Sequence, residues 1–362
     1  MPSLFDPIQV GALSLPNRVW MAPLTRGRAN REGVPTAIMA DYYAQRAGAG
    51  LIISEATGIS REGLGWPCAP GLWSKAQVEG WKPVTEAVRR AGGRIVAQLW
   101  HMGRVVHPDL GGGQPVSASA TIAPGKGHTF EGRKPHVEAR PAAIDDISRI
   151  VGDYARAARN ALAAGFDGVQ LHGANGYLID QFLRDGSNLR DDEYGGSVEN
   201  RLRLLRESTE ALVTEAGAER THVRLSPIGA VNGVDDSNPQ KLFTAAAAML
   251  DELGIASLEL REPGSGSTFL ASEQDPVSPF IREAFDGVLV LNSDYGLDSA
   301  TERLERGEAD AITFGRPFLA NPDLVERLRR GAGLNTPDPA TFYTQGPKGY
   351  VDYPALQEQA AS

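Results

Sequence analysis

The sequence predicts one α/β domain, a (β/α)8 TIM barrel over residues 1–362, on three observations. Short apolar runs rich in β-branched residues recur eight times along the chain. Segments with helical periodicity alternate with these runs. Glycines such as Gly165 and Gly254 fall between a helical segment and the next run, where a helix C-cap takes the left-handed conformation. Eight strand–helix repeats favour a closed parallel barrel over an open sheet.

The elements can be placed in order from these patterns. The expected strands are 18–21, 51–54, 95–99, 168–171, 222–225, 257–260, 288–291 and 311–314. The expected helices are 36–47, 74–91, 144–164, 197–216, 240–253, 278–284, 298–306 and 322–330, with a further amphipathic segment beginning near Leu178.

One interval, residues 103–143, is too long for a simple strand-to-helix connection and is rich in Gly, Pro, His and Ser. Long insertions after a barrel strand commonly cover the mouth of the barrel. We therefore expect a lid or small hairpin after the third strand, with residues 115–120 supplying a short strand.

Composition excludes several classes of function. Hydrophobic residues make up 41% and charged residues 22% of the 362 residues, which is ordinary for a globular protein. The formal charge of −9 argues against binding to nucleic acid or to an anionic membrane. The single cysteine, Cys68, excludes an intrachain disulfide and a four-cysteine metal site. No signal peptide and no apolar run of about 20 residues is found, so we expect a cytoplasmic protein.

Polar residues gather where the expected strands end. Thr25 follows the first strand, Gln98 lies in the third, residues 172–177 follow the fourth, and Arg224 lies near the end of the fifth. Active sites of TIM barrels lie at the carboxyl ends of the strands. The sequence therefore predicts a site built from these residues.

The segment 172–177 combines three kinds of polar side chain. His172 and Asn175 can both present N–H donors, and Tyr177 carries a phenol that is protonated at neutral pH because its ordinary pKa is about 10. Two donors and a proton source are suited to polarise and then protonate a small substrate. The alternative is a Gly-rich turn whose side chains serve packing or capping.

Residues 314–317 predict an anion site. Gly315 would let a phosphate approach the backbone, Arg316 offers a forked donor, and Pro317 suits the first turn of a helix. Phosphate sites in these barrels follow strands seven and eight. The alternative is a tight turn with a surface arginine. Gln98 and Arg224 need polar partners if they are buried, and the edge of a planar heterocycle would supply them.

The order of these motifs resembles the Old Yellow Enzyme family of FMN-dependent ene reductases, including its bacterial N-ethylmaleimide reductase-like members. The resemblance covers nearly the whole chain. The matching segments are 4–7, 17–18, 21–26, 97–101, 172–177, 192–197, 314–317, 321–324 and 349–354.

The resemblance implies roles for individual residues. It places FMN, tightly but not covalently bound, across the barrel mouth. The cofactor-binding residues it implies are Pro23, Leu24, Thr25, Ala56, Gln98, Arg224, Gly315 and Arg316. The residues it places around the substrate pocket are Trp66, Trp100 and Tyr343.

The resemblance also implies a reaction. NADPH or NADH would reduce the flavin and leave, and an activated alkene such as an enone, enal, maleimide or nitroalkene would take its place. His172 and Asn175 would hold the activating oxygen of the alkene. The β carbon would then accept hydride from flavin N5, and Tyr177 would protonate the α carbon. A monomer or homodimer is expected.

Two alternatives stay open at this point. A metal-dependent hydrolase on the same barrel would need His and carboxylate ligands at the strand ends, and no spacing of the histidines suggests a metal site. A non-catalytic flavin- or phosphate-binding barrel would have no use for His172, Asn175 and Tyr177. The loop of Asn292, Ser293 and Asp294 replaces the Gly-rich turn of many relatives, and its contribution to phosphate binding is undecided because Asp294 would repel the anion.

Overall fold

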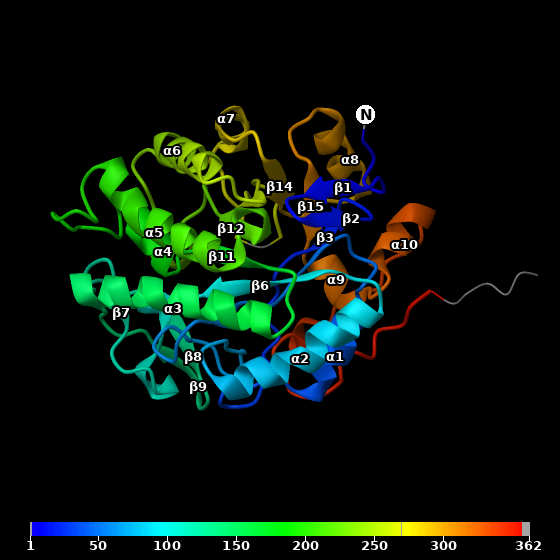
Figure 1. Cartoon of the computed structure of the whole chain (residues 1–362), viewed down its shortest axis with the longest axis horizontal. Coiled ribbons are helices and arrows are strands. Elements are labelled where there is room, and N and C mark those ends of the chain that lie inside the picture. The colour runs from blue at the N-terminus through cyan, green and yellow to red at the C-terminus, as the bar shows by residue number, and fades with distance from the viewer. Residues whose placement is uncertain (1, 269, 357–362) are drawn as a thin grey trace, which may run out of the picture.

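Eight parallel strands pair in chain order and close into a barrel (Figure 1), in a computed structural model that describes residues 2–268 and 270–356. The strands are β3 (Val19–Met21), β4 (Ile52–Ile53), β6 (Ile95–Trp100), β11 (Gly168–Gly173), β12 (Thr221–Leu225), β13 (Ser257–Arg261), β14 (Val288–Asn292) and β15 (Ala311–Phe314). The last strand, β15, pairs with the first, β3, which closes the barrel. The predicted (β/α)8 fold is therefore confirmed, with all eight strands in the expected places.

Helices surround the barrel and connect its strands (Figure 1). They are α1 (Ala37–Ala44), α2 (Lys75–Arg90), α3 (Ile144–Ala163), α4 (Leu178–Leu183), α5 (Val198–Ala216), α6 (Pro239–Glu252), α7 (Ser278–Ala284), α8 (Leu297–Glu305), α9 (Arg316–Ala320) and α10 (Leu324–Arg330). Short 3-10 turns are η1 (Gly103–Val105), η2 (Pro108–Leu110), η3 (Ala218–Arg220), η4 (Val231–Gly233) and η5 (Pro339–Thr341).

The helix ends follow the capping chemistry of the sequence. The hydroxyls of Ser74 and Ser197 accept backbone N–H donors at the starts of α2 and α5. Gly165 and Gly254, after α3 and α6, have φ angles of 90° and 64°. These left-handed angles favour glycine and let the chain turn from helix to strand.

An N-terminal hairpin that the apolar runs do not reveal covers the amino end of the barrel. Its strands β1 (Ile8–Val10) and β2 (Leu13–Leu15) are antiparallel, and their apolar residues pack on Trp20 and on inward side chains of other barrel strands. Gly11 is required at the turn, because a Cβ there would lie 2.0 Å from the carbonyl oxygen of Glu219.

The predicted insertion after the third strand does form a hairpin. Strands β8 (Lys126–Thr129) and β9 (Gly132–Pro135) are antiparallel, while β7 (Val116–Ser117) pairs with β10 (Arg140–Pro141). The strand expected at 115–120 is thus only two residues long. A further two-residue strand, β5 (Thr57–Gly58), extends the second barrel strand and pairs with the end of β6.

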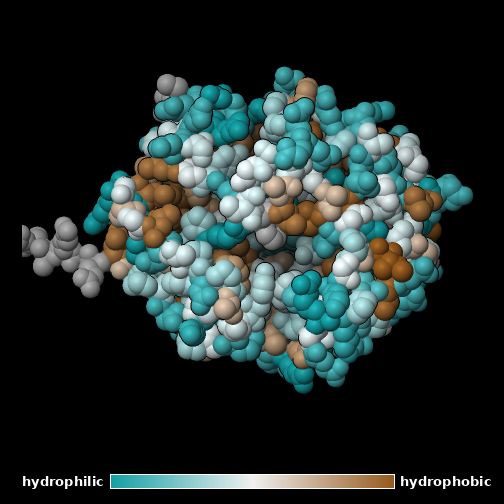
Figure 2. Space-filling model, turned by 180° about the vertical axis from the view of Figure 1, so that it is seen from behind, coloured by the Kyte–Doolittle hydropathy of each residue, from teal (hydrophilic) through white to brown (hydrophobic). Residues whose placement is uncertain are grey.

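The main apolar core lies between the barrel and its helices, and a smaller cluster inside the barrel packs against the N-terminal hairpin at the amino end. The face of the molecule seen in Figure 2 is mostly hydrophilic, with several hydrophobic patches, of which a broad one lies at the left. Within residues 2–268 and 270–356, no helix combines the length and the apolar character that crossing a membrane requires.

Candidate active site

Two neighbouring cavities lie at the carboxyl ends of the barrel strands. One, the aromatic cavity, has a volume of about 330 Å³ and is lined by Trp66, Trp100, Tyr177, Phe342 and Tyr343 together with His172, Thr25, Ala56 and Gln98. The other, the arginine cavity, has a volume of about 450 Å³ and is lined by Arg261, Asp294, Gly315 and Thr268 among others. Both are lined by Pro23, Leu24, Asn175, Arg224 and Arg316. Every site residue expected from the sequence therefore lies on one of two cavities with a common wall.

The turn that carries His172, Asn175 and Tyr177 is held from two sides. Asn175 takes a left-handed φ of 59°, and its backbone N–H donates to Ser226 Oγ at 2.7 Å. The next N–H, of Gly176, donates to Asp180 Oδ2 at 2.8 Å. Asp180 is fully buried and pairs with Arg184. Helix α4 and the loop after β12 thus fix the backbone between the three side chains.

His172 is a neutral hydrogen-bond donor toward the aromatic cavity. Burial lowers the pKa of His172 well below 6.5, and the nearby positive charge of Arg224 lowers it further. The backbone N–H of Ala174 donates to Nδ1 at 3.4 Å, so this nitrogen carries a lone pair. The proton of the neutral ring is then on Nε2, which can donate to an oxygen in the cavity.

Tyr177 lies against Trp100 and His172, with ring centroids 5.0 Å apart in both edge-on pairs. Burial raises the pKa of the Tyr177 phenol, the negative charge that Tyr343 would carry raises it further, and a hydrogen bond with the Asn232 side chain opposes the shift. Asn232 also donates from Nδ2 to the carbonyl oxygen of Asn175 at 2.9 Å. Tyr177 is therefore protonated at neutral pH, as expected, and Asn232 is a neighbour that the sequence did not reveal.

A buried polar network runs beneath the mouth of the barrel. Gln98 Nε2 donates to Gln170 Oε1 at 2.8 Å, and Gln170 Nε2 donates to Glu259 Oε2 at 2.9 Å. Glu259 pairs with Arg224, whose Nη2 donates to Asn292 Oδ1 at 2.8 Å. Gln98 and Arg224 thus have some of the polar partners that their burial requires from Gln170, Glu259 and Asn292, and a heterocycle at the cavity would add to these.

Two charged residues in the loops after the first and second barrel strands, Arg26 and Glu55, hold the outer wall of the aromatic cavity. Glu55 is fully buried and accepts the backbone N–H groups of Arg26 and Gly27 at 3.2 and 3.1 Å, which fixes the loop that carries Thr25. Arg26 donates to the carbonyl oxygen of Phe342 at 3.1 Å. This bond anchors the C-terminal segment beside the cavity, where Tyr343 lies.

An aromatic wall closes the outer side of the aromatic cavity. The ring of Trp66 stacks on His128 of the β8–β9 hairpin, with centroids 3.9 Å apart, and lies 5.0 Å from Tyr343. The insertion therefore touches the site through His128. Trp100 is only 1% exposed and packs beneath it, so this residue is both core and cavity wall.

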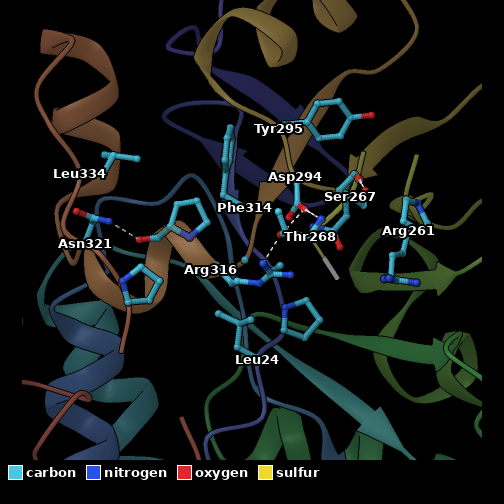
Figure 3. Close-up of a pocket in the computed structure, with 18 of the residues that line it drawn as sticks. Leu24, Arg261, Ser267, Thr268, Asp294, Tyr295, Phe314, Arg316, Asn321 and Leu334 are labelled. Atoms are coloured by element: carbon cyan, nitrogen blue, oxygen red, sulfur yellow. Dashed lines mark hydrogen bonds between the residues drawn. The ribbon is translucent and has the colours of Figure 1, made fainter. Parts of the chain in front are cut away.

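The arginine cavity is suited to an anion. Arg316 Nη1 donates to Thr268 Oγ1, and Thr268 donates to Asp294 Oδ2 from its backbone N–H and hydroxyl at 2.6 and 2.7 Å (Figure 3). A Cβ built at Gly315 would meet only Leu24 within 4 Å, at 3.5 Å, so the backbone borders open space. Helix α9 has five residues, so attraction for an anion comes from the arginines rather than from a helix dipole.

The two cavities together fit an elongated ligand with a planar polar head and an anionic tail, which describes FMN. Two polar atoms on the shared wall, Asn175 Oδ1 and Arg224 Nε, are buried and lack a hydrogen-bond partner among the described residues. A ligand lying along that wall would satisfy them. Across the described part of the chain, no three His, Cys, Asp or Glu side chains are grouped to hold a metal ion.

Comparisons with known proteins agree with this geometry. Residues 3–335 match the model of the NADH:flavin oxidoreductase / NADH oxidase family. A probable flavin mononucleotide-dependent alkene reductase of Leishmania infantum is 43% identical, with 98% of this chain and 97% of the relative covered. The flavin oxidoreductase hxnT of Emericella nidulans is 41% identical, with 98% of both chains covered.

Solved structures extend the likeness to three dimensions. The Old Yellow Enzyme homologue of Zymomonas mobilis is 59% identical with a TM-score of 0.97, covering 98% of this chain and 100% of that one. Morphinone reductase in complex with tetrahydroNAD is 45% identical with a TM-score of 0.93, covering 99% of both. The family match over most of the length and the near-superimposable barrels lead to one conclusion: the chain belongs to the NADH:flavin oxidoreductase / NADH oxidase family, within its Old Yellow Enzyme group.

Proposed function

We propose that the aromatic cavity is the substrate site of an FMN-dependent ene reductase and that His172, Asn175 and Tyr177 act directly on the substrate. The chain is an NAD(P)H-dependent flavin oxidoreductase that reduces activated alkenes. The family match therefore favours a redox enzyme over the two alternatives, a metal-dependent hydrolase and a non-catalytic barrel. The observation that supports the residue roles is that all three side chains line one cavity with Thr25, Gln98 and Arg224 on its other wall.

Bound FMN would supply the hydride for the alkene after reduction by NADH or NADPH. The residues that would hold its ring are Thr25, Ala56, Gln98 and Arg224 with the backbone of Pro23 and Leu24, and those that would hold its phosphate are Gly315 and Arg316. Two of these side chains are already held in place by the protein, because Arg224 pairs with Glu259 and Gln98 bonds to Gln170.

His172 and Asn175 would bind the carbonyl or nitro oxygen of the alkene. Negative charge grows on that oxygen as hydride reaches the β carbon, so donors aimed at it stabilise the transition state more than the ground state. The neutral imidazole of His172 offers its Nε2–H for this purpose. The buried setting strengthens the bond, since little water competes for the oxygen.

Tyr177 would deliver a proton to the α carbon. Its phenol is protonated at neutral pH because burial raises its pKa, and the turn after β11 holds it beside His172. A general acid must be protonated before it acts, and this one is. Small-molecule alkenes with one electron-withdrawing group are thus the proposed substrates, with a nicotinamide nucleotide as the second partner.

The proposal is tested by measuring the two half-reactions separately in stopped flow. Tyr177→Phe is expected to slow alkene reduction about 10²-fold or more, because general acids contribute about 10²–10⁴, while flavin reduction by NADPH or NADH stays close to normal. Tyr194→Phe is the matched control, since Tyr194 bonds to Glu207 outside both cavities. Equal slowing of both half-reactions would show that Tyr177 is not the proton donor, and protein that retains no FMN would refute the whole assignment.

A further inference from the structure

We propose that Arg261 is a third basic ligand of the arginine cavity, which binds the phosphate of the flavin together with Arg316 and offsets the repulsion of Asp294. This inference rests on the proposed function, because it assumes that FMN places its phosphate in this cavity. It concerns a residue that the motifs of the sequence do not single out.

The fold places Arg261 at the cavity by its position in the barrel. It is the last residue of β13 and lies in register with Asn292, the last residue of β14. Its side chain is 6% exposed and lines the arginine cavity. Figure 3 shows it extending from its strand beside the loop of Ser267 and Thr268, with Arg316 and Asp294 on the other side of that loop.

The balance of charge around the cavity favours a role for Arg261 in binding an anion. The charged residues that line it are Arg224, Arg261, Arg316 and Asp294. Arg224 is already paired with the buried Glu259. The remaining formal charge is +1 with Arg261 and zero without it, whereas a bound phosphate monoester carries about −1.5 to −2 at neutral pH. Arg261 therefore makes the difference between a neutral and a positive cavity.

Asp294 lines the arginine cavity, and Thr268 holds its carboxylate in place. Its Oδ2 accepts two hydrogen bonds from Thr268, and these bonds, with the positive charges of Arg316 and Arg261, hold the pKa of Asp294 below its ordinary value despite partial burial. The carboxylate is thus fixed and ionised at neutral pH. A phosphate in this cavity needs a cation that compensates for it, and Arg261 supplies one.

Arg261 also interacts electrostatically with the groups around it. Burial, more than any other cause, lowers the pKa of Arg261 to about 10; the positive charges of Arg224 and Arg316 lower it as well, and Asp294 raises it. Arg261 is therefore cationic at neutral pH but in a setting that favours an added anion. A phosphate would relieve the repulsion among the three arginines.

The test compares FMN with riboflavin, which lacks the phosphate. Holoenzyme is diluted stepwise to equilibrium, and released flavin is followed by its fluorescence. The same measurement is made on protein loaded with riboflavin by exchange. Arg261→Gln is expected to raise the Kd for FMN at least about tenfold, because it removes a charge-assisted hydrogen bond to the phosphate, and to leave the Kd for riboflavin within about twofold of wild type. Arg261→Lys is expected to lie between wild type and Arg261→Gln.

Two further variants sharpen the result. Arg306→Gln makes the same change of charge on an exposed arginine outside both cavities and is expected to leave both dissociation constants unchanged. Asp294→Asn is expected to tighten FMN but not riboflavin. Equal weakening of FMN and riboflavin by Arg261→Gln, or no weakening of either, would overturn the proposal. Failure of the wild-type protein to bind FMN would instead overturn the proposed function.

Discussion

Substituting Glu259 by Gln tests the buried network that positions the flavin wall. Glu259 is fully buried and accepts three hydrogen bonds, from Arg224, from Gln170 at 2.9 Å and from Thr313 at 2.7 Å. The change keeps the shape of the side chain and removes its negative charge. The guanidinium of Arg224, 4% exposed, is then left in the barrel without an anion.

The expected cost follows from which interactions can be repaired. The amides of Gln170 and Gln98 can rotate to accept the new N–H donor, so the hydrogen bonds are largely restored. The lost charge cannot be replaced, and breaking a buried ion pair on one side typically costs about 3–5 kcal/mol. Glu308→Gln removes a carboxylate that is 36% exposed and paired with Arg303, where about 0–1 kcal/mol is expected.

The assay is urea unfolding followed by tryptophan fluorescence, with FMN at the same excess in every sample because binding stabilises the folded state. Glu259→Gln is expected to lower the free energy of unfolding by about 3–5 kcal/mol. The double variant with Arg224→Gln is expected to be more stable than Glu259→Gln alone, since it leaves no uncompensated charge. A loss no larger than that of Glu308→Gln, or a double variant no better than the single one, would refute the reasoning.

Two further predictions concern acid stability and the proton donor. Burial lowers the pKa of His101 to about 3 and that of His222 to about 4, so below about pH 6.5 the unfolded chain binds protons that the folded chain excludes. The free energy of unfolding is expected to fall by about 1.4 kcal/mol per pH unit for each histidine between about pH 6 and 4. A urea unfolding midpoint that does not change with pH over this range would contradict the prediction. Asn232→Ala removes the hydrogen bonds to Tyr177 and to the Asn175 carbonyl. In stopped flow it is expected to slow alkene reduction several-fold while flavin reduction stays normal. Slowing of flavin reduction as well would show a general loss of structure and contradict the prediction.

The barrel could be predicted because its signals are local. Each strand is a short apolar run, and glycines such as Gly165 and Gly254 mark the turn from helix to strand. The N-terminal hairpin was missed because its two strands have three residues each, too few for alternation to stand out. The length of the strand at Val116–Ser117, expected over residues 115–120, was overestimated for a related reason: an apolar stretch does not show how many of its residues pair with another strand.

The same difference between local and long-range signals decides which residues of the candidate site could be predicted. Residues near the ends of the predicted strands, such as Thr25 and His172, could be assigned to the barrel mouth from their position alone. Glu259 and Arg261 could not, because a charged residue within a strand run gives no local sign of what faces it across a closed barrel. Asn232 and Thr268 lie in loops, and their contacts with Tyr177 and Asp294 depend on how those loops fold back over the mouth.

The arrangement of charge supports the proposed division of roles between two hydrogen-bond donors, His172 and Asn175, and one acid, Tyr177. Burial lowers the pKa of His172, and the positive charge of Arg224 lowers it further, so the imidazole is neutral and has one N–H to offer. A neutral imidazole that donates this N–H keeps its proton, so it can stabilise charge on an oxygen without releasing a proton to carbon. Burial also raises the pKa of Tyr177, yet its phenol remains the group with a proton to give. Glu259 holds Arg224 in the wall that the two cavities share, so the same ion pair would position the proposed flavin wall and keep Arg224 near His172.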